Sequence, residues 1–157
     1  MEFFGTVTGK ALTTFLMAMA PVVELRGAIP YGVAAGLPLW ECYWLAVVGN
    51  LLPVPVILLL VRRVFAWLRT GKWWGPKIAA LERRAHLKGQ LVTKYRLAGL
   101  VLLVAIPLPG TGAWTGALVA ALLDIRMKTA LPAITAGVLI AGILVGLITG
   151  GVVSVFF

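Results

Sequence analysis

Two charged residues of opposite sign lie inside an apolar stretch near the start of the chain. Glu24 and Arg26 are the only charged residues within its apolar segments. A charge inside a membrane costs about 3 kcal/mol or more and usually serves a function. We therefore predict that Glu24 takes up and releases a proton and that Arg26 binds an anionic headgroup, since a guanidinium can make two bonds to a phosphate. The alternative is a salt bridge that only holds this segment together.

A second apolar stretch offers hydrogen-bonding groups without a charge. Residues 107–116 read Pro-Leu-Pro-Gly-Thr-Gly-Ala-Trp-Thr-Gly. Backbone N–H groups near the start of a helix, together with hydroxyls, can hold an anion, although the same residues also form ordinary turns. We predict that Thr111 and Thr115 help to bind a substrate or proton, and that Trp114 packs against an apolar chain or fills the core.

Asn50 is a further candidate ligand, because it stands near the middle of an apolar span, residues 40–61. An amide at that depth predicts a polar point that faces protein rather than lipid. Pro53 and Pro55 follow it and predict a kink in the same span.

Both apolar stretches, residues 20–30 and 106–116, are predicted to interrupt a helix. Proline removes a backbone donor, and glycine favours non-helical backbone. In a membrane, irregular backbone persists only where protein buries it or where it lines a wet cavity, and a repeated pattern of broken helices indicates a transport site. The residues expected to form the two breaks are Pro21, Gly27, Pro30, Pro107, Pro109, Gly110 and Gly112.

The composition indicates an integral membrane protein. Hydrophobic residues make up 61% of the 157 residues and charged residues 12%, about half the charged fraction of a soluble domain. Residues 44–61 and 130–157 are uncharged over the length of about 20 residues that a bilayer requires. We predict a single membrane domain over residues 1–157.

The positive charge of the chain is concentrated in its central linker, residues 62–96. The formal net charge is +9, and this linker holds ten Lys or Arg residues and one acid, Glu82. A basic linker between membrane segments is cytoplasmic by the positive-inside rule. We expect it to contain an amphipathic helix that binds anionic lipid headgroups at the membrane surface, in preference to nucleic acid.

Chemistry that needs a metal or a nucleophile finds no support in the sequence. The chain has one cysteine, Cys42, and one histidine, His86, and no cluster of His, Cys and carboxylate residues at metal-ligand spacing. We expect no metal site, no cofactor and no catalytic residues, and we predict that the protein is not an enzyme.

Two topologies fit the apolar pattern. In the first, each interrupted stretch crosses the membrane, which gives four spans and places Arg126 and Lys128 outside. In the second, each stretch is a re-entrant helical hairpin that returns to its own side and precedes one transmembrane helix. The second is favoured because it places these two bases inside. Residues 1–61 and 97–157 then form an all-α inverted repeat of hairpin-plus-span units.

The last predicted span carries small residues at helical spacing. Gly142, Gly146 and Gly150 allow close contact between helices in lipid. This row fits a homodimer or higher oligomer as well as packing within one chain.

Two motifs resemble a known family. Glu24-Leu25-Arg26-Gly27-Ala28-Ile29-Pro30 and Pro107-Leu108-Pro109-Gly110-Thr111-Gly112-Ala113-Trp114 resemble the paired signature motifs of the small multidrug export family, a compact relative of the DedA/VTT superfamily. The resemblance covers nearly the whole chain. It implies two re-entrant hairpins, each followed by a transmembrane helix, and DedA relatives are associated with proton-dependent transport of undecaprenyl phosphate or other lipids.

The sequence thus predicts a multi-pass transporter of the bacterial inner membrane. Its expected substrate is amphipathic, anionic and lipid-like, of the undecaprenyl-phosphate or phospholipid type, and moves by alternating access around the hairpin tips with proton coupling through Glu24. One alternative is efflux of small amphipathic cationic drugs, bound directly by Glu24. Another is a membrane scaffold that transports nothing.

Overall fold

The described part of the chain contains helices and the turns that join them, with no strand, which confirms the all-α prediction. The computed structural model describes residues 6–70, 76, 80, 95–108 and 110–156. Most of the predicted linker helix, and Pro109, lie outside the described residues. The helices are α1 (Val7–Met19), α2 (Glu24–Ala34), α3 (Leu39–Leu51), α4 (Pro53–Arg69), α6 (Arg96–Ala105), α7 (Ala113–Leu122) and α8 (Met127–Phe156).

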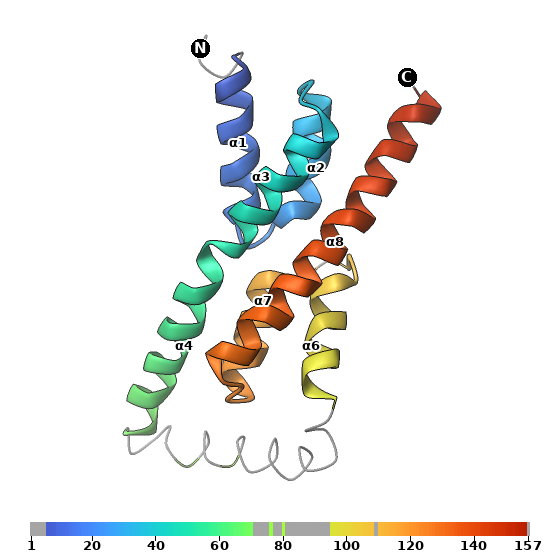
Figure 1. Ribbon diagram of the computed structural model, residues 1–157. Helices are drawn as coiled ribbons and strands as arrows, with labels where there is room; N and C mark the ends of the chain where they lie inside the picture. The colour runs from blue at the N-terminus through green and yellow to red at the C-terminus, as the bar shows by residue number, and fades with distance from the viewer. Residues whose placement is uncertain (1–5, 71–75, 77–79, 81–94, 109, 157) are drawn as a thin grey trace.

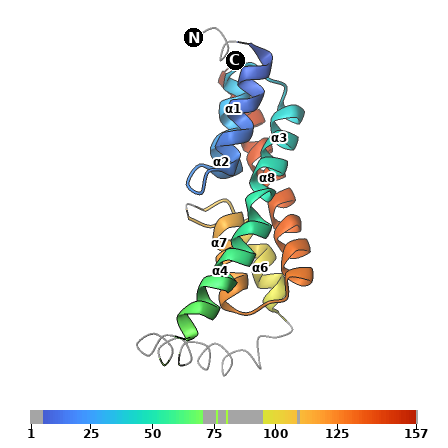
Figure 2. The ribbon, with the colours of Figure 1, turned by 90° about the vertical axis from the view of Figure 1, so that its left-hand side faces the viewer.

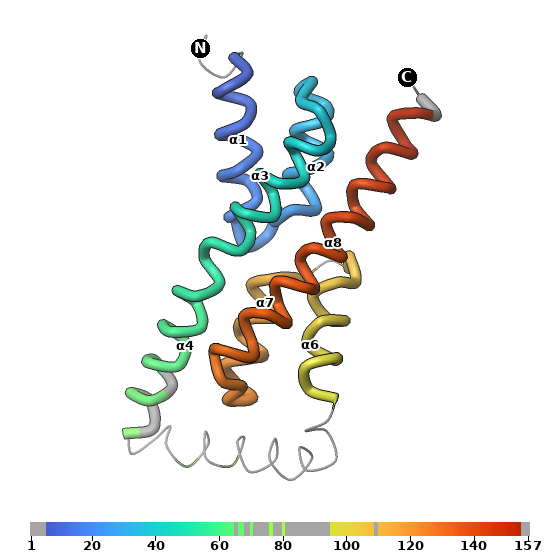
Figure 3. The backbone as a smooth tube through the Cα atoms, viewed as in Figure 1, coloured from blue at the N-terminus to red at the C-terminus, as the bar shows by residue number. Residues whose placement is uncertain are grey.

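Two helical segments are long and apolar enough to cross a membrane. The first, Leu39–Val64, comprises α3 and most of α4, and the second, Met127–Ser154, lies within α8. The path of the chain from α3 to α4 is nearly continuous (Figure 3). Leu52 between them keeps helical angles, with φ −59° and ψ −43°. Pro53 and Pro55 therefore remove backbone donors from the hydrogen-bond ladder without ending the helical path.

The shorter helices form two pairs at opposite ends of the molecule. The first pair, α1 and α2, lies at the end where both termini are drawn, and the second pair, α6 and α7, lies at the other end (Figure 1). The α3–α4 segment and α8 run past both pairs. The connection between α1 and α2 faces the connection between α6 and α7 near the middle of the molecule (Figure 2).

The first connection, residues 20–23, is shorter than the break predicted from the sequence. Ala20 adopts extended backbone before Pro21, and α2 begins at Glu24. Gly27 and Pro30 lie inside α2, so the prediction that they interrupt the helix is wrong. A proline removes one donor from the ladder, and α2 persists around it because its buried side chains are held by packing.

The second connection, residues 106–112, contains Pro107, Gly110 and Gly112, as the pattern predicts. Ile106 is extended at the end of α6, and Gly110 has φ +79°, a region that glycine enters at little cost. Thr115, placed in the second interrupted stretch, lies within α7.

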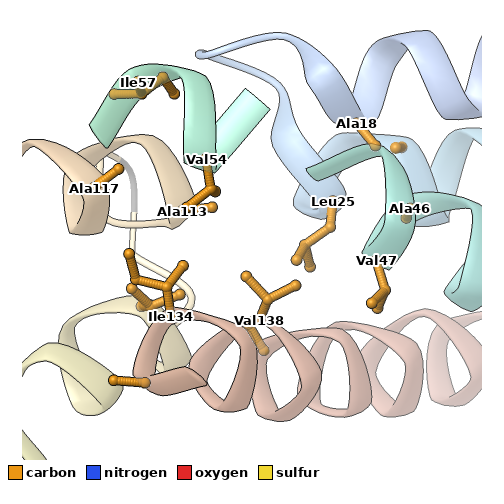
Figure 4. Close-up of a cluster of buried hydrophobic side chains, with 14 of the residues drawn as sticks. Ala18, Leu25, Ala46, Val47, Val54, Ile57, Ala113, Ala117, Ile134 and Val138 are labelled. Atoms are coloured by element: carbon orange, nitrogen blue, oxygen red, sulfur yellow. The ribbon is translucent and has the colours of Figure 1, made fainter. Parts of the chain in front are cut away.

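The core joins both ends of the molecule along α8. Ile134 and Val138 of α8 are fully buried, together with Val54 of α4 and Ala113 of α7 (Figure 4). Leu25, the neighbour of Glu24, belongs to the same cluster. The core therefore holds the start of α2 and the start of α7 in fixed positions beside α8.

The small residues of α8 pack partly within the chain. A Cβ at Gly142 would lie 2.7 Å from the ring of Tyr43 on α3, whereas at Gly146 the nearest atom, on Leu39, would be 4.0 Å away. Close internal packing thus accounts for Gly142, and a contact with another protomer through Gly146 stays a prediction.

Candidate functional site

The two connections meet through the side chain of Arg26. Its Nη2 donates to the carbonyl oxygen of Ile106 (3.0 Å) and to Thr111 Oγ1 (3.1 Å), and its Nη1 donates to the carbonyl oxygen of Leu108. The Thr111 hydroxyl in turn donates to the Ile106 carbonyl (2.9 Å). One guanidinium therefore joins residues that are 80 to 85 positions apart in the sequence.

Arg26 satisfies backbone groups that the end of α6 leaves without a helical partner. The last carbonyl groups of a helix lack intrahelical donors and carry a partial negative charge, which favours a cation there. Arg26 supplies both the charge and the donors. Its Nε is buried and has no hydrogen-bond partner among the described residues, so within this part of the chain the guanidinium retains one donor for another acceptor.

Glu24 lies against the opposite helix end, the start of α7. Its side chain is buried, and its carboxylate accepts a hydrogen bond from the backbone N–H of Trp114 (3.4 Å). A Cβ at Gly112 would collide with the same carboxylate. The N-terminus of a helix carries partial positive charge and free N–H groups, which favour an anion at this place.

The backbone of Glu24 is strained. Its φ is +50°, in the left-handed region that residues other than glycine rarely occupy. Such strain costs on the order of 1–3 kcal/mol and persists where the surrounding contacts fix it, often at functional sites. Here the buried Leu25 and the contact of Glu24 with α7 hold it in place.

Trp114 makes a third link between the connections, which the sequence did not reveal. Its indole N–H donates to the carbonyl oxygen of Met19, the last residue of α1 (3.2 Å). In each helix pair, a residue near the start of the second helix thus donates to the end of the first helix of the other pair: Arg26 to Ile106, and Trp114 to Met19. The one available signal was that a buried indole N–H requires an acceptor.

The structure brings together three of the five predicted ligands. Glu24, Arg26 and Thr111 meet between the two connections, and the described residues record no ion pair between Glu24 and Arg26. Thr115 bonds locally, since its hydroxyl donates to the carbonyl of Gly110 (2.7 Å). Asn50 is completely buried on α3.

Residues 24–144 match the model of one protein family, described as "putative small multi-drug export protein". The chain belongs to this family. The match begins at Glu24 and includes both motifs and the second connection, which confirms the family predicted from the two motifs. Neither the curated proteins nor the solved structures give a match. Together with its two long apolar helices, this membership makes the chain a membrane protein.

In this member of the export family, the site consists of one carboxylate and one guanidinium, each held by hydrogen bonds that a ligand could replace. Among the described residues, no three His, Cys, Asp or Glu side chains are grouped so as to hold a metal ion. Within the described residues, the hydrogen-bond partners of both charged side chains are backbone groups and one hydroxyl at the opposite helix ends and connection. Any movement that separates the two connections must break these bonds, and it then frees both charges.

Proposed function

We propose that this protein is a proton-coupled transporter of the bacterial inner membrane that moves an amphipathic, anionic, lipid-like molecule between the two leaflets. The observation that carries the proposal is the position of Arg26. Its guanidinium holds the two connections together by donating to uncharged oxygen atoms. An anionic headgroup accepts stronger hydrogen bonds from a guanidinium and can replace these oxygen atoms.

The lengths of the helices support re-entrant hairpins. The helices of the two pairs have 10–13 residues, which gives about 15–20 Å at about 1.5 Å per residue, whereas a bilayer core measures about 30 Å. Each pair then enters from one side and returns to it. The first pair dips from the outside and the second from the cytoplasm.

The packing also supports an inverted repeat. Helix α1 packs on α3 as α6 packs on α8, and α2 packs on α8 as α7 packs on α4. The two halves of the chain thus make the same set of contacts from opposite ends. Inverted repeats of this kind permit alternating access, because one hairpin can move against the other around a central site.

The distribution of basic residues supports a cytoplasmic linker. Arg62 on α4 donates to the carbonyl of Ile125, in the turn that precedes α8. Arg126 and Lys128 follow this turn, so the bases on both sides of the linker and those at the start of α8 gather at one end of the molecule (Figure 1). Positive charge marks the cytoplasmic side of a membrane protein. We expect this end to face anionic headgroups.

The transport step follows from the bonds between the connections. When the connections separate, Arg26 loses the carbonyl groups of Ile106 and Leu108, and the headgroup of the substrate binds in their place. Protonation of Glu24 removes the negative charge that favours the start of α7. Uptake of a proton therefore weakens the contact that keeps the two hairpins together. In this way protonation of Glu24 favours separation of the two connections.

Efflux of small amphipathic cations is the second candidate function. The buried carboxylate of Glu24 favours it, as does the description of the family. In that case Glu24 binds the substrate directly, and Arg26 only holds the hairpins together.

Transport by purified protein in liposomes separates these functions. We expect a pH gradient to drive uptake of a short-chain prenyl phosphate by the wild type. Glu24→Gln should abolish the response to the gradient, and Arg26→Gln should abolish uptake. Thr115→Val, which removes only a local bond, is the matched control. Efflux of ethidium that survives Arg26→Gln, without prenyl phosphate uptake, would favour the cation function. A folded wild type that transports neither molecule would favour a scaffold, and full transport by both charge variants would show that neither Glu24 nor Arg26 carries the transport.

A further inference from the structure

Asn50 carries a polar side chain that no other group in the described part of the chain satisfies. It is completely buried, with 0% of its surface exposed, and neither Oδ1 nor Nδ2 has a hydrogen-bond partner. Burial of an amide without partners is costly, and most buried side-chain polar atoms in proteins are paired. The other fully buried polar side chain, Thr14, is paired, since its hydroxyl donates to the carbonyl of Lys10 (2.9 Å).

The neighbours of Asn50 along the helix indicate what its face contacts. Val47, three residues earlier, packs toward Gly142 of α8, with a side-chain atom 3.5 Å from the place of a Cβ there. Val54, four residues later, lies in the core beside Ala113, the first residue of α7 (Figure 4). Residues three and four apart share one face of a helix. The face that carries Asn50 is therefore turned toward α8 and the start of α7.

This face also borders the start of α2. Leu25, which follows Glu24 in the chain, belongs to the same buried cluster as Val47, Val54 and Ala113 (Figure 4). Asn50 therefore lies on a helix face that borders the buried cluster formed by the starts of α2 and α7 with α8. A headgroup that replaces the carbonyl groups on Arg26 enters the same region.

We propose that Asn50 is a substrate-binding residue that contacts the polar headgroup of the transported molecule. The inference rests on the anionic transport proposed above. A carboxamide donates through Nδ2 and accepts through Oδ1. It is therefore complementary to a group that offers an acceptor oxygen beside a hydroxyl, such as a singly protonated phosphate ester. A tetraalkyl or tetraaryl cation offers neither group, so Asn50 selects for the anionic class.

Equilibrium binding to the purified protein tests this role, with farnesyl phosphate as the anionic probe and tetraphenylphosphonium as the cationic one. Asn50→Leu keeps the size of the side chain and removes both hydrogen-bonding atoms. It should lower the affinity for farnesyl phosphate about tenfold, as expected for the loss of one hydrogen bond to a charged group, and leave any affinity for tetraphenylphosphonium unchanged. Asn50→Gln, which keeps the amide, should lose less. Thr14→Val is the control at a paired buried hydroxyl and should bind as the wild type does.

Thermal unfolding without a probe gives an independent readout. Asn50→Leu removes an unsatisfied amide from the core, so its unfolding midpoint should rise. A lower midpoint, or failure to fold, would show that the amide stabilises the protein itself and would overturn the inference. Equal affinities of the wild type and Asn50→Leu for farnesyl phosphate would overturn the inference and leave the proposed function standing. A wild type that binds no farnesyl phosphate would overturn both.

Discussion

The carboxylate of Glu24 occupies the space that a Cβ atom at position 112 would need. The buried carboxylate and Gly112 therefore require each other. Gly112 has extended backbone, with φ 164°, which any residue can adopt. The glycine is therefore explained by space and not by conformation. Its lack of a side chain lets the carboxylate reach the first N–H groups of α7.

Gly112→Ala should destabilise the protein by about 1–3 kcal/mol, the usual cost of overpacking, because the methyl group displaces the carboxylate. Gly99→Ala is the matched control, since a Cβ there meets no atom within 4 Å and alanine favours the helix. Thermal unfolding in detergent measures both. Glu24→Ala should reduce the effect of Gly112→Ala in a double-mutant cycle. Equal midpoints for the two glycine variants would contradict the assigned contact.

Trp114→Phe should weaken the contact between the connections, because it keeps an aromatic ring but removes the donor to Met19. The expected cost is about 1–2 kcal/mol, since a helix-end carbonyl loses its partner. Amide hydrogen exchange of residues 20–23 should become faster. Tyr43→Phe, which removes a longer bond of 3.4 Å to the carbonyl of Leu139, is the comparison. Unchanged exchange in Trp114→Phe would mean that the indole only fills space.

The topology is open to chemical labelling in intact cells. In a Cys42→Ser background, a cysteine at Arg126 should be protected from an impermeant thiol reagent added outside, because the proposed topology places the basic end of the molecule in the cytoplasm. A cysteine at Trp40, which is 65% exposed near the opposite end of α3, should react and serves as the positive control. Reaction at position 126 from outside would instead support four spans.

The row of glycines in α8 should respond unequally to leucine. Gly142→Leu should reduce the yield of folded protein, because the side chain collides with the ring of Tyr43 and the two helices must separate. Gly146→Leu should retain the fold. Size-exclusion chromatography with light scattering measures both folding and oligomeric state. Loss of a dimer in Gly146→Leu would locate an interface there, whereas loss of the fold would contradict the assigned spacing.

The sequence predicted the elements of the site better than their partners. The apolar stretches, the two connections and the exceptional position of Glu24 and Arg26 follow from composition and from proline and glycine. Their residue types inside an apolar segment suggest either a salt bridge that holds this segment together or a ligand site. In the structure the two side chains contact the two helix ends that flank a connection 80 to 90 residues away, and no local pattern encodes such a contact.

The failures have physical causes of the same kind. Pro30 is tolerated inside α2 because tertiary packing outweighs the loss of one backbone donor. The role of Trp114 depends on where the last carbonyl of α1 lies, which only the assembled fold determines. Asn50 was identified because its residue type is unusual at its depth, but the absence of a partner within the protein required the structure.

The exchange of donors between Arg26 and Ile106 and between Trp114 and Met19 has a consequence for biosynthesis. The end of α1 receives the indole donor of Trp114 from the second half of the chain, and the end of α6 receives the guanidinium of Arg26 from the first half in addition to its local donors. During synthesis at about 5–20 residues per second, the end of α1 waits on the order of 10 s for the indole that will cap it. Until Trp114 has been synthesised, the carbonyl of Met19 lacks the donor that it has in the finished fold, so the first helix pair reaches its final set of hydrogen bonds only when the second pair packs against it.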